Sequence, residues 1–167
     1  MGRWRPPQPK SSPYITAEGF RALEEELKAI WVRRREVTKA LAAAAAEGDR
    51  SENAEYIYRK KELREIDRRV RYLQKRLPDL RIVPQRTEED ERIFFGAWVT
   101  LETEKGDEVT YRIVGPDEFD PARSSISIDS PLARGLLKKT IDDEVTIRTE
   151  HGEVTYIVLE VGYSKEA

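Results

Sequence analysis

Residues 41–56 read LAAAAAEGDRSENAEY, and this stretch separates two helical patterns. The alanine run has the highest intrinsic helix propensity, and Gly48 then interrupts it. Seam positions before the break alternate three and four residues apart, as in a heptad repeat: Phe20, Leu23, Leu27, Ile30, Arg34, Val37, Leu41 and Ala44. The same spacing follows the break at Tyr56, Arg59, Leu63, Ile66, Val70, Leu73, Leu77 and Leu80. Two such patterns joined by a short turn predict an antiparallel two-helix coiled coil.

The ends of the two predicted helices carry recognisable signals. We expect the first helix to open at Thr16 as N-cap and the second to begin at about Ser51. Pro78 should end or kink the second helix, because proline lacks the amide hydrogen that a helix interior needs. About 30 residues per helix, at ~1.5 Å each, predict an arm of roughly 45 Å.

After Pro84 the pattern changes to short alternating runs, which predict a small α+β domain. Strands are expected at 97–103, 109–114, 125–129, 144–148 and 154–161, with hairpin turns at 106–107 and 151–152. Residues 130–139 predict a short helix with Pro131 at its first position. The predicted organisation is a disordered tail (1–13), a coiled-coil arm (14–84) and a small domain (85–167).

Composition excludes several classes of protein. The chain has no cysteine, so it has no disulfide framework and no thiolate metal site. No apolar run approaches the roughly 20 residues of a membrane span, and the proline-rich start does not have the pattern of a secretory signal. We therefore expect a cytoplasmic protein that makes no membrane contact.

Charge is distributed unevenly along the chain. Residues 59–76 contain nine basic and three acidic residues, a balance of +6, whereas residues 87–167 contain nine basic and nineteen acidic residues, a balance of −10. The first stretch should attract phosphates or an acidic protein surface, and the second should repel phosphates. Exposed charges on a coiled coil are also the ordinary solvated face of such a helix, so charge alone leaves both interpretations open.

Asp49 and Glu52 lie three residues apart between the two predicted helices. One interpretation is a capping box, with Asp49 as N-cap and Glu52 at the third helical position. The other is a metal half-site at the far end of the arm. Two carboxylates hold Mg²⁺ poorly by themselves, but they suffice where a partner supplies the remaining ligands. The two interpretations are compatible with each other.

The stretch from Gly48 to Tyr56, GDRSENAEY, resembles the tip motif of the bacterial Gre transcript cleavage factors. The stretches KKELREIDRRVRYL (60–73), FFGAWV (94–99) and ISIDSPLAR (126–134) are similar to the GreB branch of that family. The resemblance covers roughly residues 14–163 and includes both predicted parts of the chain.

This resemblance implies an FKBP-like fold for the small domain and a partner, bacterial RNA polymerase. The domain would dock at the rim of the polymerase's secondary channel and the coiled coil would enter the channel. The acids at the tip, Asp49 and Glu52 by motif position, would help to hold the second catalytic Mg²⁺, which is shared with the polymerase, and to activate water; Ser51 is a third candidate. The chain would thus be no enzyme itself, would act as a monomer, and would stimulate the polymerase to hydrolyse backtracked RNA. The basic stretch would contact the RNA 3′ segment through Lys60, Lys61, Arg64, Arg68 and Arg71.

Other classes of function remain to be separated by experiment. The arm could plug the channel as an inhibitor, and an FKBP-like domain could be a prolyl isomerase or chaperone, although fold does not establish activity. A coiled-coil RNA-binding module that acts without polymerase is a further alternative. We interpret Tyr56, Tyr58 and Tyr72 as seam and flank packing rather than as base-stacking residues, and the only histidine, His151, as a turn residue without a catalytic role.

Overall fold

The computed structural model describes residues 10–48, 53–86 and 91–164, and the chain divides into two compact units. We call Glu18–Leu80 the arm and the second unit, Met1–Ala17 with Arg81–Ala167, the domain. The arm is shorter than the predicted range 14–84, because a few residues on either side of it pair with each other inside the domain.

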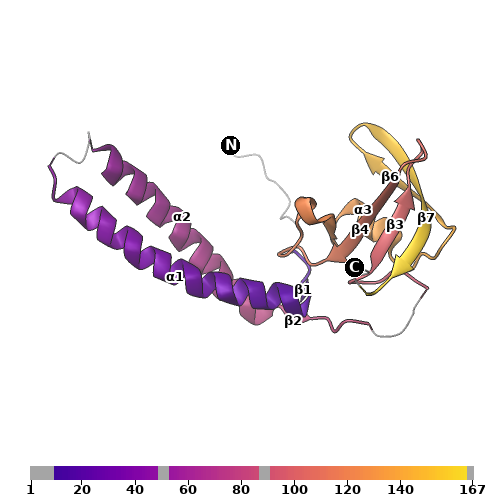
Figure 1. The fold of residues 1–167 in the computed structure, drawn as a ribbon, viewed down its shortest axis with the longest axis horizontal. Coiled ribbons are helices and arrows are strands. Elements are labelled where there is room, and N and C mark those ends of the chain that lie inside the picture. Colours follow the sequence, from indigo (N-terminus) through magenta and orange to yellow (C-terminus); the bar gives the residue numbers. More distant parts are fainter. Residues whose placement is uncertain (1–9, 49–52, 87–90, 165–167) are drawn as a thin grey trace, which may run out of the picture. The chain divides into compact units, whose positions relative to one another are not determined.

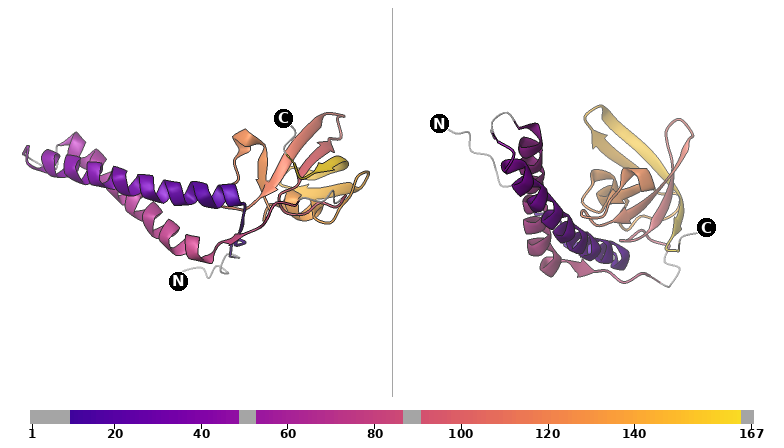
Figure 2. Two further views of the ribbon diagram at one scale, coloured as in Figure 1. Left: turned by 60° about the horizontal axis from the view of Figure 1, so that its bottom comes forward. Right: turned by 60° about the vertical axis from the view of Figure 1, so that its left-hand side comes forward.

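The arm is a pair of helices that run in opposite directions along each other (Figures 1 and 2). Helix α1 (Ala17–Ala45) begins directly after Thr16, as predicted, and α2 (Ala54–Arg76) is followed by a short 3-10 helix, η1 (Leu77–Asp79). Pro78 therefore falls where the α-helix has ended, as its chemistry requires.

The start of α2 corrects the prediction. The helix begins at Ala54 rather than near Ser51, and its N-cap is Asn53, whose side-chain oxygen accepts a hydrogen bond from the Tyr56 backbone N–H at 3.1 Å. Asp49 is therefore not the N-cap of this helix. Asn53 also donates from its side-chain nitrogen to the carbonyl oxygen of Ala44 at 2.8 Å, so a single amide caps α2 and ties it to α1.

The heptad seam is confirmed by burial. Val37, Ile66 and Val70 form a buried cluster, with Leu27, Ile30 and Leu63 partly buried against it. Further buried seam positions are Leu23 and Ala44 on α1 and Leu73 on α2. This apolar strip is narrow, so most of the surface of each helix remains in contact with water.

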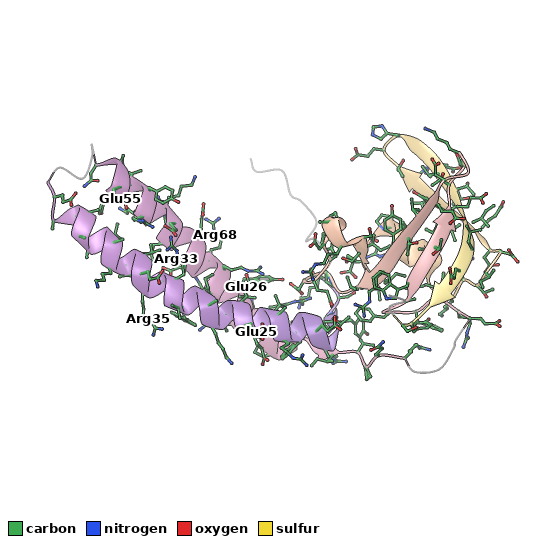
Figure 3. All side chains as sticks on the ribbon, viewed as in Figure 1. Glu25, Glu26, Arg33, Arg35, Glu55 and Arg68 are labelled. Atoms are coloured by element: carbon green, nitrogen blue, oxygen red, sulfur yellow. The ribbon has the colours of Figure 1, made fainter. Side chains whose placement is uncertain are left out.

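Ion pairs cross between the helices beside the seam. Arg34, which interrupts the apolar pattern, donates from Nε to Asp67 at 2.7 Å. On the opposite flank, Arg69 donates to both oxygens of Glu26, at 2.8 and 2.9 Å, in the bidentate geometry that suits a carboxylate. Another crossing pair joins Arg33 to Glu62. Figure 3 shows Arg33 and Glu26 between the helices, while Arg35 and Arg68 point away from the hairpin on opposite sides.

The domain is built on a five-stranded sheet of order β5-β4-β3-β7-β6, in which only β4 and β5 are parallel. The strands are β3 (Trp98–Glu102), β4 (Glu108–Val114), β5 (Ser125–Ser127), β6 (Glu144–Thr149) and β7 (Gly152–Gly162). All five strands were predicted, and Gly106 and Gly152 occupy the hairpin turns with positive φ, which glycine adopts without strain. Helix α3 (Pro131–Leu136) is shorter than the predicted 130–139 and has Ser130 as N-cap.

One face of this sheet carries the main core. Most of its buried members come from the strands and α3, and include Val99, Leu101, Ile113, Ala133, Leu136, Val145, Ile147 and Val158. Gly135 allows α3 to lie close to the sheet, since a Cβ there would meet Val145 Cγ1 at 2.9 Å. The alternation predicted from the sequence is clearest in β3 and β6, where Val99, Leu101, Val145 and Ile147 are buried at every second position.

Two short strands outside the main sheet were not predicted. β1 (Tyr14–Ile15) and β2 (Arg81–Ile82) pair in parallel immediately before and after the arm. Two carboxylates bind the segment that contains β1: Asp129 accepts from the N–H and hydroxyl of Ser12, and Glu118 accepts from those of Thr16. Ser12 therefore belongs to the folded domain, although the sequence places it in a disordered tail.

The Asn53 amide yields a test of how the hairpin is closed. Asn53→Ala should lower stability by about 1 kcal/mol through loss of the cap, and should speed hydrogen exchange at the Tyr56 amide. Asn53→Asp keeps the capping oxygen but removes the donor to Ala44, so it isolates the bond between the helices. Thermal unfolding of the wild type and the two variants measures the contributions of the cap and of the bond between the helices. An unchanged midpoint for Asn53→Ala would contradict the role of Asn53 as N-cap.

Gly115 tests the attachment of the β1 segment. A Cβ at this position would lie 2.0 Å from the carbonyl oxygen of Tyr14 and 3.0 Å from Glu118 Oε2. Gly115→Ala should therefore destabilise the domain by about 1–3 kcal/mol, as overpacking does. Gly162→Ala is the matched control, because no atom lies within 4 Å of its added Cβ. Chemical denaturation compares the two, and equal stability would exclude the close approach of Tyr14.

Candidate functional site

The predicted tip acids lie in the connection between α1 and α2. Asp49, Ser51 and Glu52 are outside the described residues, so their roles stay predictions. The residues on either side are described: Ala44 is buried, Gly48 has φ of +127°, and Asn53 is the N-cap of the second helix. The Asn53–Ala44 hydrogen bond joins the two helices at this end of the arm.

The five predicted RNA-binding residues are all on α2, and all are exposed. They are Lys60, Lys61, Arg64, Arg68 and Arg71, and we call them the basic stripe. Spacings of three and four residues place them on one helical face, away from the buried seam at Leu63, Ile66 and Val70. Within the described part of the chain, none of the five forms an ion pair.

Two other arginines of the same stretch have a different environment. Arg59 donates to Glu55 at 2.8 Å and to Glu62 at 3.0 Å, and Arg69 is held by Glu26. The sequence count of nine basic residues therefore combines two groups. One group stabilises the hairpin, and the other faces solvent and can meet phosphates.

Glu62 is the centre of the largest charge network in the described part of the arm. Partial burial raises the pKa of Glu62, but hydrogen bonds from Arg33 and Arg59 outweigh this effect and hold the pKa below its usual value. The hydrogen bond from Arg33 to Glu62, with that to Glu36, in turn raises the pKa of Arg33. Glu62 therefore stays ionised at neutral pH, and its ion pair with α1 is lost only as the pH falls through this lowered pKa.

The tyrosines of α2 divide between the seam and its flank. Tyr56 is half-buried at a seam position, whereas Tyr58 and Tyr72 are exposed and each has its ring near an arginine. Sequence pattern alone does not fix the exposure of these rings, because tyrosine is common both in seams and at surfaces. His151 is exposed in the turn between β6 and β7, as predicted.

Two further observations limit the chemistry of the described residues. No group of three or more His, Cys, Asp or Glu residues gathers among them as a metal site. None of the helices they form is long and apolar enough to cross a membrane. A carboxylate pair at the tip fits the oxygen ligands that Mg²⁺ prefers, but would need further ligands from elsewhere.

Comparison with solved structures finds alignments over most of the chain at low sequence identity. The structure of GreA factor homolog 1 from Thermus thermophilus aligns over 89% of this chain and 97% of its own, with 24% identity and a TM-score of 0.41. A GreA/GreB elongation factor structure from Nitrosomonas europaea aligns over 91% of this chain, with 19% identity and a TM-score of 0.41.

Sequence comparisons are much closer. A protein from Pseudomonas aeruginosa named transcription elongation factor GreB is 56% identical over 98% of both chains. The protein of that name from Xanthomonas axonopodis is 58% identical over 98% of this chain and 99% of its own. Family models for the N-terminal and C-terminal parts of GreA/GreB elongation factors match residues 13–82 and 88–163. The resemblance inferred from the tip motif is confirmed: this chain belongs to the GreA/GreB family of transcription elongation factors.

Proposed function

We propose that this elongation factor inserts its arm into the secondary channel of bacterial RNA polymerase and stimulates the polymerase to cleave backtracked RNA. The observation that carries the proposal is the hairpin itself: two long helices close at Asn53, directly beside the acidic tip motif. A helix of 29 residues reaches about 44 Å, which suits delivery of side chains to a distant site.

The chain's own residues contribute position and charge. Asp49 and Glu52 would present carboxylate oxygens to the second catalytic Mg²⁺ of the polymerase, and Ser51 would add a hydroxyl. That ion supplies charge neutralisation and a more acidic water molecule when it is bound. The interhelical ion pairs of Glu26, Arg33 and Arg34 hold the two helices together, so the tip is carried by a paired support rather than by a single helix.

The basic stripe would hold the RNA 3′ segment that leaves the active site during backtracking. Its exposed side chains lie along α2, starting six residues after the helix begins at Ala54. Phosphates bind such a stripe without sequence preference. A longer RNA segment would meet more of the stripe, which favours the release of longer fragments.

The domain would dock at the rim of the channel as an FKBP-like module. The acidic balance of residues 87–167 disfavours phosphate contacts, and a protein surface is therefore its expected partner. Prolyl isomerisation by the domain, or simple blocking of the channel by the arm, would be alternative activities. The cleavage experiment below separates channel blocking from stimulation, and a prolyl isomerase assay of the full chain measures isomerisation.

Removal of one tip carboxylate should abolish stimulated cleavage without loss of folding. We expect Asp49→Asn and Glu52→Gln to lower the rate of factor-dependent cleavage by about 100-fold, as loss of one preorganised electrostatic group does. Ser51→Ala should have a smaller effect. Cleavage of a backtracked elongation complex measures the rate, and competition with the wild-type chain measures binding to polymerase.

Three outcomes, two of this experiment and one of a prolyl isomerase assay, oppose the proposal. Full stimulation by both carboxylate variants would remove the acids from the mechanism. Inhibition by the wild-type chain would show a channel-blocking protein. Prolyl isomerase turnover by the full chain, with no effect on polymerase, would assign the function to the domain.

The basic stripe predicts a salt effect. Replacement of Lys60, Arg64 and Arg68 by alanine should reduce the slope of log affinity against log salt by up to about 0.7 per residue for single-stranded RNA. The triple variant Lys28→Ala, Arg35→Ala and Lys39→Ala removes equal charge from exposed positions on α1. It should leave the slope for RNA unchanged, and equal losses from both variants would show that only net charge matters.

A further inference from the structure

Two tyrosines of α2, Tyr58 and Tyr72, are exposed beside the basic stripe. Tyr58 is 60% exposed and Tyr72 is 42% exposed. Single exposed aromatic residues are common on protein surfaces, so exposure alone has no functional meaning. These two tyrosines share a second property, which is contact with an arginine.

Each of the two rings lies against an arginine that is itself fixed by carboxylates. The guanidinium of Arg69 lies 5.3 Å from the ring centroid of Tyr72, and Glu26 on α1 holds that guanidinium by two hydrogen bonds. The guanidinium of Arg59 lies 5.5 Å from the ring of Tyr58 and is held by Glu55 and Glu62. Cation–π contact with an immobilised arginine keeps each ring in place at the surface.

The tyrosines are also neighbours of the stripe on the helix. Tyr58 lies three residues before Lys61, and Tyr72 lies four residues after Arg68, which are the spacings of side chains that meet on a helical surface. The two tyrosines are 14 residues apart in sequence, which is about 21 Å along the helix axis. The two aromatic rings thus lie beside the two ends of the basic stripe on α2.

We propose that Tyr58 and Tyr72 are stacking platforms for the bases of a single-stranded RNA whose phosphates lie on the basic stripe. Aromatic rings combined with a basic track are the usual means of binding single strands, and stacking tolerates any sequence because every base has a π face. The proposal rests on the function proposed above and adds residues that contact bases. Tyr58 is near the tip end of α2 and Tyr72 is farther from it, so a short extruded segment reaches only Tyr58, whereas a long one reaches both.

The test uses backtracked elongation complexes with short or long extruded RNA segments, with normal or abasic nucleotides in those segments. Tyr58→Ala should raise the concentration of factor for half-maximal cleavage by about fivefold or more on normal RNA. Tyr58→Phe should behave as the wild type, because phenylalanine keeps the ring. Tyr72→Ala should matter only with the long segment, and Tyr72→Phe should again restore it.

Abasic RNA distinguishes stacking from contact with protein. It keeps every phosphate but has no base, so the wild-type chain and Tyr58→Ala should become equivalent on it. A loss that persists on abasic RNA would show that the ring contacts the polymerase instead, and would overturn the proposal. Equal performance of all chains on normal RNA would overturn it as well.

Trp31 supplies the matched control. It is 39% exposed on α1, and it also lies near a paired arginine, Arg34, whose guanidinium is 5.9 Å from its ring. Asp67, the partner of Arg34, is on the flank of the seam opposite Glu62 and Arg69, so Trp31 is separated from the two tyrosines. Trp31→Ala should leave cleavage of both RNA lengths unchanged, and circular dichroism confirms that each variant keeps its helices.

A second measurement does not depend on polymerase. The affinity of the free full chain for a fluorescent single-stranded RNA should fall about fivefold or more in the double variant Tyr58→Ala, Tyr72→Ala, with no change in the salt slope. The abasic oligonucleotide should show no such difference. If the chain failed to stimulate cleavage, the proposed function would fail while this measurement still tested stacking; equal affinities here would overturn the stacking proposal alone.

Discussion

The arm depends on ion pairs that cross between its two helices. A two-helix hairpin has only one narrow apolar strip, here centred on Val37, Ile66 and Val70, and cannot surround itself with a core. Pairs such as Arg34–Asp67 and Arg69–Glu26 extend the contact to both sides of that strip. Single exposed ion pairs contribute little to stability, but several in one narrow interface also select the register in which the helices meet.

The same arrangement explains why only part of the basic stretch is available to a partner. Arg59 and Arg69 are engaged by carboxylates, and in that position they support the rings of Tyr58 and Tyr72. Lys60, Arg64 and their neighbours on the stripe face solvent. The charged residues of α2 therefore have two roles. Some form ion pairs that stabilise the hairpin, and others face solvent.

Sequence reasoning succeeded where the signal was periodic and failed where it depended on a distant partner. The seam residues Leu23, Ile66 and Leu73 and all five strands of the main sheet follow from spacing alone. The Asn53 amide that caps α2 also bonds to Ala44 of the other helix, a contact that sequence spacing does not reveal. Strands of two residues, such as Tyr14–Ile15, are too short to show a period. The exposure of the stripe was predicted correctly, whereas the tip acids stay predictions because they lie outside the described residues.

The parallel pair β1–β2 has a consequence for how the chain can be altered. The chain leaves the domain beside β1 and returns beside β2, and the two strands hydrogen-bond to each other through Arg81 N–H to the Pro13 carbonyl and Val83 N–H to the Ile15 carbonyl. The helical hairpin is therefore inserted between two strands that are paired with each other, so the chain enters and leaves the hairpin at neighbouring points. The length of such a hairpin can therefore be changed by adding or removing whole heptads, or the hairpin of a relative can be inserted in its place. In each case the β1–β2 hydrogen bonds of the domain are kept.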